Sequence, residues 1–106
     1  MMAEIRGPVD EDVQAIAQAL QAYEQHHSQA EVVLYRQNSV AVSVRIIDAD
    51  FQGISRADRH DLVWDYFAAL PDETQSQVTI LLLLTPEETE NSIANLDFEH
   101  PIPSRL

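Results

Sequence analysis

The sequence predicts a single α+β domain, with the order helix, strand, strand, helix, strand, helix and a three-stranded mixed sheet packed by the helices. Three patterns predict this class. Apolar residues recur with helical spacing between residues 10 and 27, alternate with period two from residue 31, and form a mostly aliphatic run at 78–84. The 106 residues include two glycines and are 45% hydrophobic, which fits one packed core. We assign 1–8 to an N-terminal extension, 9–95 to the domain and 96–106 to a C-terminal tail.

The first helix is predicted to follow Asp10, whose side chain can cap it. Glu11 and Asp12 then place negative charge at its exposed amides. The apolar stripe of this helix consists of Val13, Ile16, Ala17, Leu20 and Tyr23. We expect the helix to end near residues 26–27.

Period-two alternation from Glu31 predicts a hairpin with Asn38 and Ser39 at its tip. In that register one buried face pairs Val33 with Val44 and Tyr35 with Val42. The opposite face would be a mixed surface, open to solvent or to a partner. It would carry Val32, Leu34, Arg36, Ser43 and Arg45.

The second helix is predicted to start at Ser55, because Ser55 and Asp58 resemble a capping box, and to end at Pro71. Residues 72–77 are expected to form a loop into a buried strand at 78–84. A right-handed crossover would place that strand parallel to the second one. Thr85, Pro86 and Glu88 have the pattern of a helix start, which predicts a short last helix ending near residue 95 and an extended tail.

The third strand has apolar side chains on both faces, with Leu81 and Leu83 pointing opposite to Ile80, Leu82 and Leu84. If the two long helices pack on one face, the other exposes leucines. We therefore expect Leu81 and Leu83 to form a surface for a homodimer or another partner.

Composition excludes several classes of function. The net charge is −12 and lysine is absent, which argues against nucleic-acid binding. Zero cysteines exclude disulfides and thiolate chemistry. The longest apolar run is far shorter than a membrane span and no signal peptide is evident, so we expect a soluble, cytoplasmic protein without membrane contact.

Residues 51–60 hold two of the six arginines. Arg56, Arg59 and His60, with Arg36 and Arg45, are the candidates for partner binding. Arg56 and Arg59 fit equally well as ion-pair partners of nearby aspartates, and His60 fits a packing role better than a ligand role. The capping role accounts for Ser55, and adjacent His26 and His27 lack the i, i+4 spacing that metal sites favour. We expect no catalytic residue and no metal site.

The same segment has the spacing F-x-G-x-S-R-x-x-R-H, and residues 84–88 supply a second motif, Leu-Thr-Pro-Glu-Glu. Together they resemble the signature of BolA-like proteins. The resemblance implies a fold related to class II KH domains and a binding module, not an enzyme. It also implies association with monothiol glutaredoxins through a shared [2Fe-2S] cluster, or transcriptional regulation of stress response. The residues with structural roles in the motifs are Phe51, Gly53, Ser55, Thr85 and Pro86.

The ligands that the resemblance implies for a cluster are absent. The family's histidine lies eight positions before the threonine of the second motif, where this chain has Gln77, and residues 37–40 contain neither Cys nor His. We therefore expect no cofactor, and a regulatory interaction module that acts through protein contacts, with a monothiol glutaredoxin as one candidate partner. The alternative is a BolA-type DNA-binding transcriptional regulator that uses Arg56, Arg59 and His60.

Overall fold

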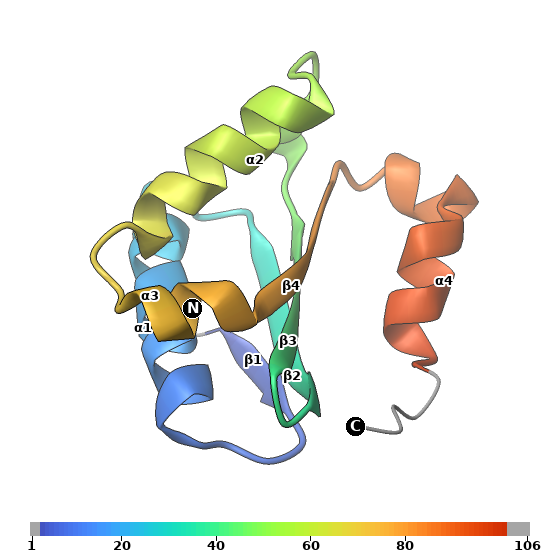
Figure 1. Cartoon of the computed structure of the whole chain (residues 1–106). Helices are drawn as coiled ribbons and strands as arrows, with labels where there is room; N and C mark the ends of the chain where they lie inside the picture. The colour runs from blue at the N-terminus through green and yellow to red at the C-terminus, as the bar shows by residue number, and fades with distance from the viewer. Residues whose placement is uncertain (1–2, 102–106) are drawn as a thin grey trace.

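A four-stranded mixed sheet lies at the centre of the structure, a computed structural model that describes residues 3–101 (Figure 1). Its strands, in spatial order, are β1 (Glu4–Arg6), β2 (Glu31–Asn38), β3 (Ala41–Ile47) and β4 (Val78–Leu84). β2 and β3 are antiparallel, while β1 and β4 lie parallel to their neighbours. The α+β class and the mixed sheet are confirmed. The predicted number of three strands is wrong, because residues 4–6 pair with β2.

Helices cover the two faces of the sheet unequally. The face that we call the front carries α1 (Glu11–His26), α2 (Arg56–Trp64) and α3 (Asp72–Gln77), and the back carries α4 (Ile93–Glu99) (Figure 1). Short 3-10 turns occupy Ala49–Phe51, Asp65–Phe67 and Glu88–Asn91. Within residues 3–101, no helix has the length and apolarity needed to cross a membrane.

The start and the apolar stripe of α1 agree with the prediction. The Asp10 carboxylate accepts a hydrogen bond from the Val13 amide at 2.9 Å, and all five apolar residues of the stripe are buried. α1 ends at His26, within the range predicted. The helix therefore forms as its capping and spacing indicate.

The hairpin exists, but its predicted register is wrong. Leu34 pairs with Val44 and Tyr35 with Ser43, and the pairing shifts between Arg36 and Asn38. The turn itself is Ser39–Val40, one residue later than expected. Because one residue of slip exchanges the two faces of a strand, Val32 and Leu34 pack in the front core and Val33 and Tyr35 face the back.

Two boundaries after α2 also differ from the prediction. Residues 72–77 form α3, not a loop, with Pro71 before its first turn. The capping box at the end of β4 does form, since the Thr85 amide donates to Glu88 Oε1 at 2.8 Å and the Glu88 amide to Thr85 Oγ1 at 3.3 Å. It opens only a 3-10 turn, and α4 begins after a second cap at Ser92, so residues 96–99 are helical and not an extended tail.

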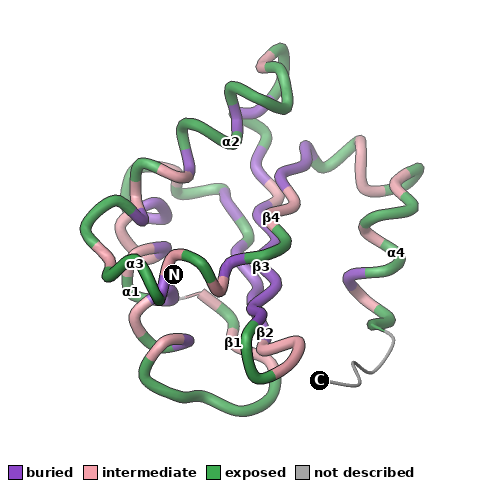
Figure 2. Tube along the Cα trace, viewed as in Figure 1, coloured by how far each residue is buried: buried purple, intermediate pink, exposed green. Residues whose placement is uncertain are grey.

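The front core is large and the back core is small. The front cluster joins α1, α2, the 3-10 turn at 65–67 and the sheet, whereas the buried part of the back cluster consists of Val33, Tyr35 and Phe98. Leu83 is 7% exposed and belongs to the front core, and Leu81 packs against it, so their predicted exposure on an uncovered face is wrong. Leu82 packs against the back cluster. Figure 2 shows buried positions concentrated in the strands and mostly exposed positions along α4.

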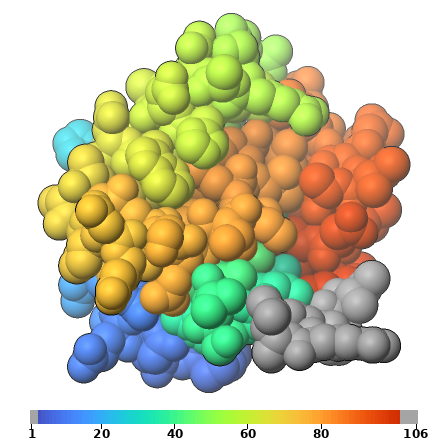
Figure 3. All heavy atoms as spheres, in the orientation of Figure 1, coloured from blue at the N-terminus to red at the C-terminus, as the bar shows by residue number. Residues whose placement is uncertain are grey.

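β4 is an edge strand and part of it reaches the surface. Figure 3 shows its orange atoms between the yellow-green atoms of α2 and the red atoms of the C-terminal segment. Ile80, which faces the back, is 46% exposed. β4 is thus partly accessible, because neither α2 nor α4 fully covers it.

Candidate functional site

Most arginines in the described part of the chain form ion pairs within the fold. Arg6 pairs with Glu4 and Glu99, Arg36 with Asp10, Arg45 with Glu99, and Arg59 with Glu88. Arg56 is exposed, and it makes no ion pair with any residue in 3–101. In a chain of net charge −12, Arg56 is therefore the described arginine that is available for another molecule.

Arg59 is a structural residue. It is 5% exposed, and its guanidinium donates to both carboxylate oxygens of Glu88 at 2.7 and 3.2 Å. It also donates to the carbonyl of Ile54 at 2.8 Å and to that of Leu83 at 3.1 Å. These bonds hold the start of α2 against the end of β4, which gives Arg59 the ion-pair role that the sequence left open beside partner contact.

The Arg59 contact changes the acidity of its partner. The Arg59 guanidinium, helped by the Thr85 amide, lowers the pKa of Glu88 to about 2. Glu88 is therefore ionised at neutral pH and is held at the junction between β4 and the 3-10 turn that follows. The ion pair between Arg59 and Glu88 therefore connects residues 51–60 with residues 84–88, the two segments that contain the sequence motifs.

The motif residues around Arg59 have local structural roles. Gly53 has φ +79°, a conformation that L side chains rarely adopt, and the Ser55 hydroxyl accepts a hydrogen bond from the Asp58 amide at 3.2 Å. Phe51 is 2% exposed and its ring lies under the Arg59 guanidinium at 5.5 Å. These residues shape the junction into α2.

Arg36 and Gln77 lie in one polar network on the front side. Arg36 donates to Gln77 Oε1 at 2.8 Å, and Gln77 donates to Asp12 Oδ2 at 2.7 Å. Thr74 donates to the other oxygen of Asp12 at 2.8 Å. Both ends of the Gln77 amide are thus occupied by contacts that connect α1, β2 and the end of α3.

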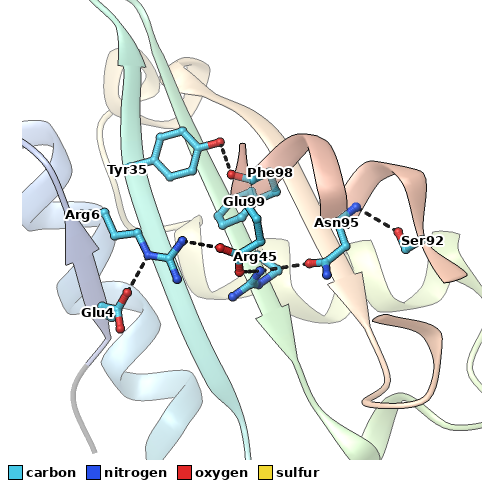
Figure 4. A network of polar contacts seen from close by, with 8 residues as sticks. All are labelled: Glu4, Arg6, Tyr35, Arg45, Ser92, Asn95, Phe98 and Glu99. Carbon is cyan, nitrogen blue, oxygen red and sulfur yellow. Dashed lines mark hydrogen bonds and ion pairs between the residues drawn. The ribbon is translucent and has the colours of Figure 1, made fainter. Parts of the chain in front are cut away.

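Arg45 holds α4 on the back of the sheet (Figure 4). Its guanidinium bonds Glu99 and the Asn95 side chain, the latter at 2.9 Å, and lies over the Phe98 ring at 4.9 Å. Arg6 bonds the other Glu99 oxygen at 2.8 Å. The two arginines lower the pKa of Glu99 to about 2. Arg45 is 6% exposed, so its contacts in this structure are within the fold.

His27, Asp48 and Asp50 form a cluster between the end of α1 and the turn after β3. Their potential ligand atoms lie within 4.8 Å of one another. Asp48 is 1% exposed, accepts a hydrogen bond from the Tyr23 hydroxyl at 2.6 Å and accepts another from the Asp50 amide at 2.9 Å. His27 stacks on the Tyr23 ring at 4.1 Å. These contacts fit a structural connection between α1 and the turn.

Arg56 and His60 line a groove beside β4, together with Leu81, Leu82, Leu83 and Leu84. We call it the α2–β4 groove. Its volume is about 210 Å³, and none of its lining residues is acidic. His60 stacks on Trp64 with ring centroids 5.3 Å apart, so Arg56, His60 and Trp64 follow one another at i, i+4 spacing along α2.

The groove unites only part of the predicted site. Arg56 and His60 lie in it, whereas Arg36, Arg45 and Arg59 are in internal networks. The sequence did not predict that Arg56 and His60 lie beside the leucines of β4. Their i, i+4 spacing does place both residues on one side of α2. The sequence also did not predict Glu88 as the partner of Arg59, because the two residues are far apart in the chain.

Comparison with known proteins adds no assignment: the chain matches no family model, no curated protein and no solved structure. What the groove can do follows from its own chemistry. A guanidinium binds carboxylates and phosphates, and leucine side chains bind apolar groups.

Proposed function

We propose that this protein is a non-enzymatic interaction module that binds a partner protein through the α2–β4 groove. The observation that carries the proposal is the position of Arg56, an exposed arginine without an ion pair among residues 3–101, on a groove otherwise lined by His60 and leucines. A guanidinium beside apolar surface is typical of protein interfaces, where arginine is enriched and lysine depleted.

We also propose that the protein is a BolA-like regulatory module of the cytoplasm, in keeping with the two sequence motifs. The α+β class and the structural roles of Gly53, Ser55 and Thr85 support this relationship. Gln77 supports the absence of a glutaredoxin-shared cluster, because an amide bonded to Arg36 and Asp12 is not free to bind iron. A monothiol glutaredoxin is the first partner to test, and its binding is expected without a bridged [2Fe-2S] absorption band.

Three purified variants and one purified partner test the function. Arg56→Gln and Gln18→Glu each make the net charge one unit more negative, but Gln18 is exposed on α1 outside the groove. Titration calorimetry with a partner first identified by affinity capture should show weaker binding by Arg56→Gln, still weaker binding by Arg56→Glu, and unchanged binding by Gln18→Glu.

The results that would contradict the proposal are distinct. Affinity that is unchanged in both Arg56 variants would place the interface elsewhere. A mobility shift with duplex DNA at low salt that is lost in Arg56→Gln would favour the DNA-binding alternative instead.

A further inference from the structure

The two edges of the sheet differ in how they are protected. The β1 edge is three residues long, and two of them, Glu4 and Arg6, are charged and ion-paired. The β4 edge is seven residues long, without charge or proline. Proteins normally protect long apolar edges with charges, prolines or covering segments, because an open edge recruits another strand. β4 has no such residue of its own.

The backbone direction of β4 shows which groups are open. The Leu84 carbonyl accepts a hydrogen bond from the Asp48 amide at 2.9 Å, so Leu84 and Leu82 direct their backbone groups toward β3 and the segment that follows it. By alternation, Leu81 and Leu83 direct theirs outward. The bond from Arg59 to the Leu83 carbonyl agrees with this direction and occupies that carbonyl. The open edge is therefore centred on the amide and carbonyl of Leu81.

From these features we infer that β4 accepts an extended, mainly apolar segment of a partner protein as a fifth strand, with a carboxylate of that segment against Arg56. The inference rests on the proposed function of the α2–β4 groove and specifies its partner. The Leu81 backbone would supply the strand pairing, and the leucines that line the groove the apolar contacts.

The charge of the groove favours this occupant over a second copy of the chain. Arg56 is the arginine in the lining of the groove, and the complement of a guanidinium is a carboxylate. The β4 strand of a second copy contains no acidic residue to face Arg56, and two chains of net charge −12 repel each other. A partner segment that carries its own Asp or Glu satisfies the site.

A peptide panel tests both parts of the inference with the full-length chain. The probes are capped nine-residue peptides of alternating threonine and valine, with one aspartate at each position in turn, and the same peptides with asparagine. Binding is measured by fluorescence anisotropy. At the peptide position that faces Arg56, the aspartate peptide should bind the wild-type protein about threefold to fivefold more tightly than the peptide with asparagine there. Arg56→Gln should remove this preference, and Gln18→Glu should keep it.

Amide hydrogen exchange gives a readout for the strand itself. On saturation with the tightest peptide, the Leu81 amide should exchange at least about tenfold more slowly, because it becomes hydrogen-bonded. The Leu82 amide, which already faces β3, should change little and is the internal control. Methylation of the peptide nitrogens that face β4 should abolish binding, whereas methylation of the alternate nitrogens should not.

Each contrary result has its own meaning. If no peptide binds while a protein partner still depends on Arg56, strand addition is wrong and the proposed function stands. A preference for aspartate that survives in Arg56→Gln contradicts the assignment of the carboxylate. Sedimentation that shows a dimer, with Leu81 protected in the absence of peptide, would identify a second copy as the occupant.

Discussion

The two faces of the sheet are stabilised by different means. The front face is covered by three helices around a continuous apolar cluster, with fully buried Phe67 and Tyr23 at its centre. The back face is covered by the seven-residue α4, which contacts the sheet through Phe98 and a charged network. The hydrophobic effect that stabilises the front is non-directional, whereas the ion pairs of the back depend on geometry and ionisation. The front should therefore set the stability of the whole domain, and the back should open separately.

Truncation of the buried aromatic residues should separate the two faces most clearly. Phe67→Ala should destabilise the domain by about 3–5 kcal/mol, the usual cost of such a cavity in a core. Phe98→Ala should cost only about 1–2 kcal/mol, because α4 can detach while the front core remains folded. Urea unfolding followed by the fluorescence of Trp64, the chain's single tryptophan, measures both. Equal losses would mean that α4 belongs to the same cooperative unit.

The same contrast explains which parts of the fold could be predicted from the sequence. α1, the start of α2 and β4 were predicted because capping residues and apolar periodicity are local signals. β1 was missed because three residues that include Glu4 and Arg6 show no strand pattern. The hairpin register was wrong because its pairing shifts beside Gln37, and α4 was misplaced because the capping box at Thr85 precedes a second cap at Ser92.

The candidate site could be predicted only in part, for the same reason. Arg56 and His60 lie together because they are one helical turn apart. Arg59 was assigned to the surface because its partner, Glu88, comes 29 residues later. Arg45 was assigned to the surface because the register error placed it on a mixed face open to solvent, and because Glu99 is 54 residues away. The burial of a charge depends on such distant partners.

Removal of the carboxylate that holds α4 should have the next largest effect. Glu99→Gln leaves Arg45 buried without its charge partner, which is unfavourable, although detachment of α4 can return Arg45 to solvent. We expect the α4-docked state to be destabilised by about 1–3 kcal/mol relative to the detached state. This should be seen as faster amide exchange in residues 93–99. Arg6→Gln is the matched control, because 40% of the Arg6 side chain is exposed and its loss should cost much less. Unchanged exchange in Glu99→Gln would show that Phe98 alone holds the helix.

Loss of one hydroxyl group on the back face should have a smaller effect. The Tyr35 hydroxyl donates to the Phe98 carbonyl at 2.9 Å, a group near the end of α4. Tyr35→Phe should weaken α4 docking by about 1 kcal/mol, because a buried carbonyl loses its donor while the aromatic contact remains. The exchange of the α4 amides should rise, and the urea midpoint of the front core should fall less than in Phe98→Ala. A midpoint shift larger than that of Phe98→Ala would contradict the separate opening of the back face.

The smallest effect should come from acid, and its sign follows from the two lowered carboxylate pKa values. The pKa of Glu99 and that of Glu88 are about 2 in the folded protein, below the usual 4.5, so their stabilisation is complete above pH 4.5 and is lost as the pH falls toward 2. Because 34% and 39% of these side chains are exposed, solvent screens the pairs, and we expect about 0.5–1 kcal/mol from each.

Relief of the chain's net repulsion at low pH acts in the opposite direction. The measurement is therefore the difference in α4 amide exchange between wild type and Glu99→Gln, taken at pH 5 and at pH 3. That difference should shrink at pH 3, and a constant difference would show that the charge of Glu99 does not hold α4.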